Sequence, residues 1–170
     1  MMVAAILSTA LRMKFPVVLI LASLGSGCLF DSAVESLAFH YYQLELRDGW
    51  QHRTEKAPAD PYQGDLITIE GPARIGILQI QAYVAPTTVS KDILRNITNV
   101  DHSLDLAMQR WGDFSGFDYE YVEKKVSYRQ WWLADDRTMI FITYQRPQDS
   151  PDVESDAIDT IVGSLRLNTP

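Results

Sequence analysis

The chain has 170 residues, of which 46% are hydrophobic, and it carries a formal net charge of −7 and a single cysteine. This length is enough for one domain with a substantial core. The acidic balance and the scattered Lys and Arg residues disfavour nucleic-acid binding, because a negative surface repels phosphate backbones. One thiol also excludes a framework of internal disulfides.

The first thirty residues have the pattern of a targeting segment. Arg12 and Lys14 precede an apolar run over residues 15–24, and no acidic residue occurs before Asp31. Positive residues, a short apolar run and then small residues are typical of a secretory signal peptide. Translation starting at Met13 would give a compact signal; the preceding residues are otherwise a long positive region.

Cys28 follows Ser26 and Gly27 at the end of this segment. The pattern resembles a bacterial lipoprotein signal, although Gly25 stands where that pattern prefers Leu. The resemblance implies that residues 1–27 are removed and that a lipid is attached to the Cys28 thiol. An ordinary signal peptide cleaved nearby, an uncleaved anchor and a buried N-terminal helix stay open as alternatives. Cys28 could also be a free cysteine buried in the core.

A lipoprotein signal would place the mature chain on the periplasmic side of the bacterial cell envelope, anchored in the membrane. Residues 28–38 would form a short tether, and residues 39–170 a single domain. Cleavage removes two positive charges and no negative ones, so the net charge changes from −7 to −9.

Three strands are predicted in the first half of the domain. Alternating apolar residues place them at 39–47, 66–70 and 73–84, and the loop formers of residues 55–65 join the first two. The residues expected to face inward are Tyr42, Leu44, Leu46, Ile67, Ile69, Leu78, Ile80, Ala82 and Val84.

Helical spacing follows these strands. Ser90 is a candidate N-cap for a helix whose apolar residues are Ile93, Leu94 and Ile97. A second helical pattern is predicted over residues 101–111, and the two patterns form either one kinked helix or two short ones. The apolar face of the second pattern would contain Leu104, Ala107, Met108 and Trp111.

Three further strands are predicted at 117–123, 126–134 and 138–146, with a tight turn at residues 135–137. The last strand is apolar on both faces, which predicts a central position covered on both sides.

The chain ends in a predicted amphipathic helix. Ser150 is the expected N-cap, and Pro151 suits the first helical position. Its apolar stripe would consist of Val153, Ala157, Ile158, Ile161, Val162 and Leu165.

This order of elements predicts an α+β domain with a mostly antiparallel sheet of about six strands and helices packed on it. The segments LELRDGW, GILQIQAY, WWLADDRTMIFITYQ and IDTIVGSLRL resemble those of the PsbP-like sandwich group, which includes DcrB-like envelope lipoproteins. The resemblance extends over residues 39–167. It implies a late strand pair packed on the C-terminal helix, a binding or assembly role, and no shared catalytic residues.

Residues with catalytic or metal-binding chemistry do not form a convincing site in the sequence. His40, His52 and His102 lack the spacing of metal ligands. The run at residues 101–105 contains Asp, His and Ser, but within one turn these residues fit helix capping better than a catalytic triad. The adjacent Asp135 and Asp136 fit a hairpin turn. We therefore expect no enzyme activity, no cofactor and no metal, and a hydrolase stays as a third hypothesis.

Aromatic residues give the strongest functional signal. The candidate partner-binding residues are Phe114, Phe117, Tyr119, Tyr121, Trp131 and Trp132. Aromatic side chains are enriched at recognition surfaces, but they are also ordinary core residues, and both interpretations stay open. Trp131 and Trp132 must point to opposite faces of their strand.

We therefore expect an envelope-anchored domain that binds a protein partner through an aromatic and acidic face. One alternative is an immunity protein that neutralises a toxin. The other is a small-molecule or lipid carrier with a pocket between the sheet and the helices.

Overall fold

The computed structural model describes residues 34–57, 62–98 and 100–168. The strands are β1 (Val34–Ala38), β2 (Tyr42–Arg47), β3 (Gln51–Glu55), β4 (Gln63–Glu70), β5 (Ile77–Val84), β6 (Gln109–Trp111), β7 (Phe114–Glu123), β8 (Val126–Asp135), β9 (Thr138–Pro147) and β10 (Arg166–Leu167). The helices are α1 (Lys91–Ile97) and α2 (Ser155–Gly163).

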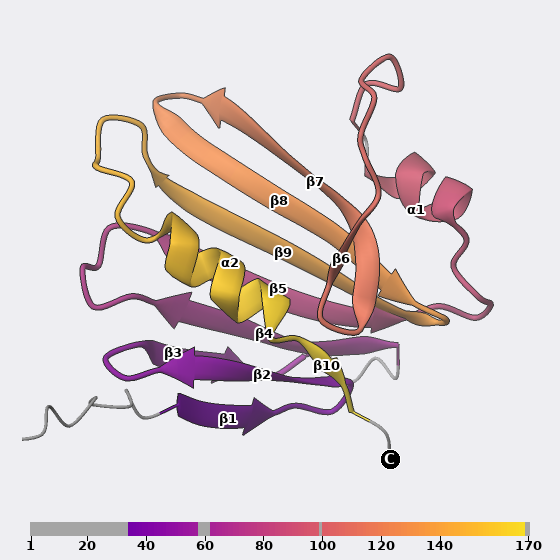
Figure 1. Ribbon diagram of the computed structural model, residues 1–170. Coiled ribbons are helices and arrows are strands. Elements are labelled where there is room, and N and C mark those ends of the chain that lie inside the picture. Colours follow the sequence, from indigo (N-terminus) through magenta and orange to yellow (C-terminus); the bar gives the residue numbers. More distant parts are fainter. Residues whose placement is uncertain (1–33, 58–61, 99, 169–170) are drawn as a thin grey trace, which may run out of the picture. The chain divides into compact units, whose positions relative to one another are not determined.

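Within the described residues these elements form two antiparallel sheets with a helix on each side of the larger one (Figure 1). The large sheet has seven strands in the order β3-β4-β5-β9-β8-β7-β6, and the small sheet has the order β1-β2-β10. The predicted α+β class is confirmed. The expected single sheet of about six strands is replaced by two sheets.

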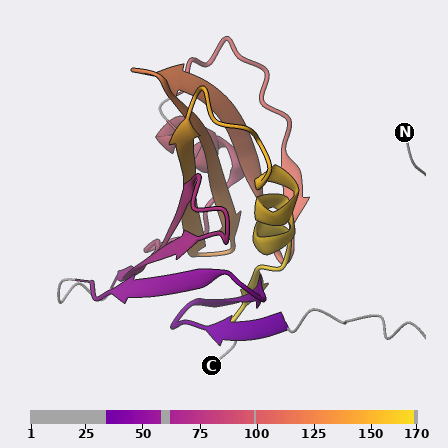
Figure 2. The same ribbon diagram turned by 90° about the vertical axis from the view of Figure 1, so that its left-hand side faces the viewer.

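The strand register divides the large sheet into two faces with different partners. Trp131, Ile142 and Ile80 lie side by side on what we call the core face. Trp132, Phe141 and Gln81 lie side by side on the opposite one, the outer face. The core face packs against α2 and the small sheet, whereas α1 covers only part of the outer face (Figure 2).

The predicted inward residues of the early strands are buried except Val84, which is only partly buried at the end of β5. Tyr42, Leu44 and Leu46 are buried on β2, and Ile67 and Ile69 are fully buried on β4. The central strand is β9, which is fourth of seven in the large sheet, as its two apolar faces predict.

Four short strands have no counterpart among the predicted elements: β1, β3, β6 and β10. All five residues of β3 are exposed, so this edge strand has no apolar alternation to reveal it. β1 pairs with β2 over Val34–Ala38, so the end of the segment expected as a tether is part of the small sheet. Edge strands with polar exposed sides carry little sequence signal because they bury few side chains.

The helix predicted over residues 101–111 is wrong. The segment is a turn that leads into β6, and the Arg95 guanidinium holds its backbone. Arg95 donates to the carbonyls of Val100, Asp101 and Leu104 at 3.2, 2.8 and 3.1 Å. The Asp101 carboxylate accepts a hydrogen bond from the Ser103 backbone amide at 2.9 Å, which forms a local turn instead of a helix cap.

The C-terminal helix is shorter than predicted. It begins at Ser155, and its N-cap is Glu154; the Ser150 hydroxyl instead donates to the Pro147 carbonyl at 2.6 Å. The Glu154 side chain makes no capping hydrogen bond to the helix, and its carboxylate is buried against the sheet. Its Oε2 accepts hydrogen bonds from the Gly76 amide at 3.1 Å and from the Tyr144 hydroxyl at 3.0 Å. These contacts join the start of α2 to the large sheet.

Candidate functional site

Three of the six aromatic residues proposed as partner-binding lie inside the domain. Phe114 and Trp131 are fully buried in the main core, and Phe117 is buried on the outer face. The docking role expected for these three side chains is therefore wrong, because a partner cannot reach them. Tyr119, Tyr121 and Trp132 are only partly buried and share the outer face.

The two acidic residues between the tyrosines of β7 lie on the opposite face of the strand, so they are not part of the tyrosine surface. Asp118 and Glu120 alternate with the tyrosines of β7, so they point to the core-face side of the sheet. There the Arg129 guanidinium binds the Asp118 carboxylate at 3.0 Å and the Asp159 carboxylate of α2 at 2.8 Å. The guanidinium also lies over the Trp131 ring, 4.5 Å from its centroid. These charges therefore join the sheet to α2.

Trp131 and Trp132 point to opposite faces of the sheet, as the sequence predicts. Trp131 lies in the main core. Trp132 packs against Phe141 of the neighbouring strand, with ring centroids 4.3 Å apart. The apolar outer side of β9 thus continues onto β8. It forms the floor of the candidate site.

Helix α1 forms the wall of this site. The Ser90 hydroxyl accepts a hydrogen bond from the Ile93 amide at 3.2 Å, which confirms the predicted N-cap. Leu94 is the buried residue of the helix, whereas Ile93 and Ile97 are more than 40% exposed. A helix this short depends on tertiary packing for stability, so Leu94 anchors it to the sheet.

An apolar pocket of about 390 Å³ lies between α1 and strands β5, β8 and β9. Its lining consists of Tyr83, Leu94, Ile97, Trp132, Leu133, Met139, Ile140 and Phe141. The Tyr83 hydroxyl donates to Gln81 at 2.6 Å, and burial raises the pKa of Tyr83. This lining residue of the pocket therefore remains a neutral phenol. A pocket of this volume and lining accepts an apolar group and offers few polar contacts.

Two exposed apolar side chains lie on the same helix. Ile93 and Ile97 are 45 and 41% exposed and lie one turn apart on α1, so they share a face of the helix. We call these two residues the apolar rim. Leu104 and Met108, on the segment that follows α1, are also exposed but do not line the pocket. Single exposed apolar residues are common, but exposed ones beside an apolar pocket indicate an interaction surface.

The remaining outer face is a row of tyrosines. Tyr119, Tyr121 and Tyr128 stack on β7 and β8, with ring centroids 5.6 and 4.9 Å apart along the row. The Tyr119 hydroxyl donates to Gln130 at 2.6 Å. This row lies on the same face as the pocket but does not line it.

Sequence reasoning finds Trp132 but misses its partners in the pocket. It predicts that the strand at 138–146 is apolar on both faces, and it places Ile97 on a helix. The sequence signal that could have found the pocket is that β9 is apolar on both faces. A second layer of structure must therefore cover its outer face. Only the structure shows that α1 covers this face incompletely.

Groups with catalytic potential remain dispersed. Across residues 34–57, 62–98 and 100–168, no group of three or more His, Cys, Asp or Glu side chains is placed to hold a metal ion. The Asp101 carboxylate is engaged by the Ser103 amide within its own turn, and Asp136 accepts a hydrogen bond from the Thr88 hydroxyl at 2.7 Å.

The fold is that of an α+β domain of PsbP-like architecture. The chain is similar to a cyanobacterial PsbP (CyanoP) from Synechocystis, with a TM-score of 0.52 and 16% identity over 85% of this chain and 99% of that one. It is also similar to a protein from Bacteroides thetaiotaomicron, with a TM-score of 0.53 and 11% identity. That match covers 75% of this chain but only 45% of the Bacteroides chain.

These likenesses confirm the PsbP-like resemblance at the level of the fold. No protein-family model matches the sequence, and no curated protein sequence matches it. Because identities of 11 and 16% show the fold alone, the function has to be argued from the site.

The predicted signal peptide and the lipidation of Cys28 lie outside the described residues. None of the helices that the structure describes is long and apolar enough to cross a membrane.

Proposed function

We propose that this chain is a non-enzymatic binding domain of the bacterial cell envelope, anchored by a lipid on Cys28. Its partner is a protein that places an apolar side chain in the pocket between α1 and the large sheet. The observation that carries this proposal is the pocket of about 390 Å³ with Trp132 and Phe141 in its lining and exposed Ile97 at its edge.

The apolar rim favours a protein over a small ligand. A molecule that only fills the pocket would leave Ile93 in water. A protein surface that places one side chain in the pocket can cover this residue as well, and burying apolar area stabilises a complex by about 25 cal/mol per Å². A central buried anchor surrounded by less important contacts is also the usual arrangement of protein interfaces.

The negative net charge of the chain favours a basic partner. With residues 1–27 removed the chain carries a formal net charge of −9. Long-range attraction would speed its association with a basic protein and make the rate depend on ionic strength. A toxin with a basic active site would be one such partner, in which case the domain would act as an immunity protein.

Replacing Ile97 with glutamate is expected to abolish capture of the partner. The change places a charge at the pocket edge, where a bound apolar side chain would have to desolvate it. The measurement is an affinity capture from envelope extract, quantified by mass spectrometry, with the full chain as bait.

Val122→Glu is the matched control, because Val122 is 54% exposed on β7 and does not line the pocket. It should retain every protein that the unchanged chain captures. If Ile97→Glu captures the same proteins at the same level, the pocket is not the docking site.

A small-molecule carrier is the second candidate, favoured by the pocket volume. A volume of about 390 Å³ falls within the range of roughly 300–1,000 Å³ that is usual for small-ligand sites. In this case native mass spectrometry of the purified chain should show an apolar ligand at one per chain. Ile97→Glu should lose that ligand in the absence of any protein partner.

Cys28→Ser is expected to release the protein from the membrane fraction, because acyl chains supply the proposed anchor. Mass spectrometry of the mature N-terminal peptide should find a lipid on Cys28 in the unchanged chain. An unmodified peptide that runs through Cys28 would refute lipidation and leave the pocket proposal untouched.

A further inference from the structure

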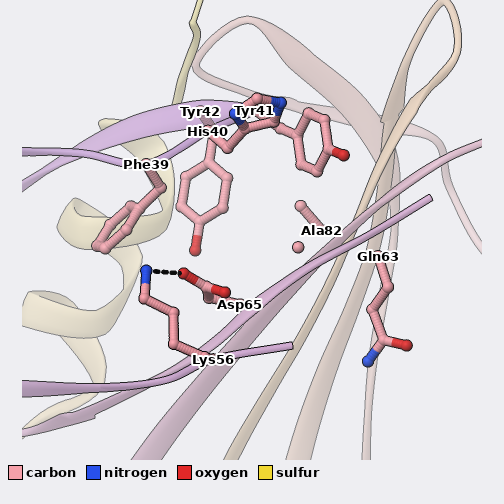
Figure 3. Close-up of a pocket in the computed structure, with 9 residues that line it drawn as sticks. Phe39, His40, Tyr41, Tyr42, Lys56, Gln63, Asp65 and Ala82 are labelled. Atoms are coloured by element: carbon pink, nitrogen blue, oxygen red, sulfur yellow. Dashed lines mark hydrogen bonds and ion pairs between the residues drawn. The ribbon is translucent and has the colours of Figure 1, made fainter. Parts of the chain in front are cut away.

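A second, polar cavity lies where the two sheets meet. Its volume is about 270 Å³. Phe39, Tyr41 and Tyr42 line it from the small-sheet side, and Lys56 and Asp65 line it from the large-sheet side (Figure 3). Gly64 also belongs to the lining. The outer-face pocket shares none of these residues.

The Tyr42 hydroxyl is a buried polar group without a hydrogen-bond partner. Tyr42 is 2% exposed, and its ring ends beside the Lys56–Asp65 ion pair (Figure 3). A buried hydroxyl left unpaired usually costs about 1–3 kcal/mol, so native structures rarely keep one without a reason. A ligand that accepts this hydrogen bond supplies such a reason.

Lys56 and Asp65, whose side chains lie beside Tyr42, form an ion pair with each other. The Lys56 ammonium donates to Asp65 Oδ2 at 2.7 Å, and the Ala57 amide donates to Oδ1 at 3.0 Å. These hydrogen bonds, that of Lys56 first, lower the pKa of Asp65 and keep it ionised. Burial and then the Asp65 charge raise the pKa of Tyr42, so its hydroxyl stays a donor.

We propose that this cavity binds a neutral, hydroxyl-rich molecule of one-ring size, such as a monosaccharide unit or a cyclic polyol. The inference goes beyond the proposed function, since it concerns another part of the domain and a ligand of opposite polarity.

The arrangement of donors and acceptors selects hydroxyl groups. A ligand hydroxyl accepts from the Tyr42 phenol and donates to the Asp65 carboxylate, which retains free lone pairs. An anionic ligand would be repelled by Asp65, and a cationic ligand by Lys56, so a neutral ligand fits the paired charges best.

The size and walls of the cavity limit the ligand to one ring. About 270 Å³ lies just under the range of roughly 300–1,000 Å³ of drug-sized sites. Gly64 lies against the Tyr41 ring, where an added Cβ would come within 3.2 Å of it. The rings of Phe39 and Tyr41 offer apolar walls for the C–H face of a sugar.

The test is an NMR titration of the isotope-labelled full chain with glucose, N-acetylglucosamine and myo-inositol, beside acetate and tetramethylammonium. We expect saturable shifts at the amides of residues 40–42 and 64–65 with at least one neutral compound. Tyr42→Phe should weaken that binding by about tenfold or more, the effect of one lost hydrogen bond.

Tyr42→Phe should leave the free energy of unfolding unchanged or higher, since it removes only an unpaired hydroxyl. Tyr128→Phe makes the same change on the outer face and should bind as the unchanged chain does. Asp65→Asn should weaken binding as well. The proposal is overturned if no neutral compound gives saturable shifts, if Tyr42→Phe binds equally well, or if acetate or tetramethylammonium binds more tightly.

Discussion

Replacing Trp131 with alanine is expected to lower the free energy of unfolding by about 3–5 kcal/mol, the range measured for Trp or Phe to Ala changes in cores. Trp131 is fully buried on the core face beside Ile142. The truncation leaves a large cavity and removes the ring over which the Arg129 guanidinium lies. Urea unfolding monitored by circular dichroism measures the loss, with the slope m unchanged.

Trp132→Ala is the matched control for this prediction. The same residue type one position along the chain lies half-buried over the outer-face pocket, so we expect a loss of about 1–2 kcal/mol. Trp132→Ala should impair partner capture, whereas the milder Trp131→Phe should leave capture intact. Equal stability losses for the two alanine variants would contradict the assignment of the faces.

Replacing Glu154 with alanine is expected to lower the free energy of unfolding by about 2–4 kcal/mol. The change leaves two buried donors, the Tyr144 hydroxyl and the Gly76 amide, without their shared acceptor. Each unpaired buried group costs about 1–3 kcal/mol, and the removal of a buried carboxylate offsets part of this. Urea unfolding again provides the measurement.

Asp152→Ala is the control for Glu154. Asp152 is a nearby acidic residue that forms a partly exposed ion pair with Arg146 at 3.3 Å. Such surface pairs contribute about 0–1 kcal/mol, so this variant should be close to neutral. If Asp152→Ala and Glu154→Ala lose the same amount, the buried contacts of Glu154 do not stabilise the start of α2.

The long strands are predictable because one or both of their faces are buried. Leu44 on β2 and Ile67 on β4 belong to alternating patterns that the structure confirms. The central place of β9 follows from its two apolar faces. In each case the signal comes from side chains whose face of the strand is set by the strand period.

The helical signals after β5 are less reliable. Ser90 caps α1 as predicted, but the apolar spacing of Leu104 and Met108 belongs to an exposed turn. The Arg95 side chain takes carbonyls of that turn as acceptors. The spacing of apolar residues cannot reveal such a contact, because it does not show which donor the backbone carbonyls of the segment will accept.

The candidate site was likewise only partly predictable from the sequence. Alternation along β8 is enough to place Trp131 and Trp132 on opposite faces. It does not show which face is exposed, so the aromatic pattern also selects Phe114, Phe117 and Trp131 for docking, although all three are buried. The polar cavity around Tyr42 has no local signal at all, since Lys56 and Asp65 reach it from the side of the other sheet.

The sequence by itself determined the α+β class, the long strands and the side of the strand on which each residue lies. The tertiary structure alone decided that the early strands divide between two sheets, that α1 leaves an apolar pocket uncovered, and that Tyr42 faces an ion pair. The physical reason is that side-chain alternation is set by the local backbone period. Cover and cavities depend instead on how separate elements pack against one another.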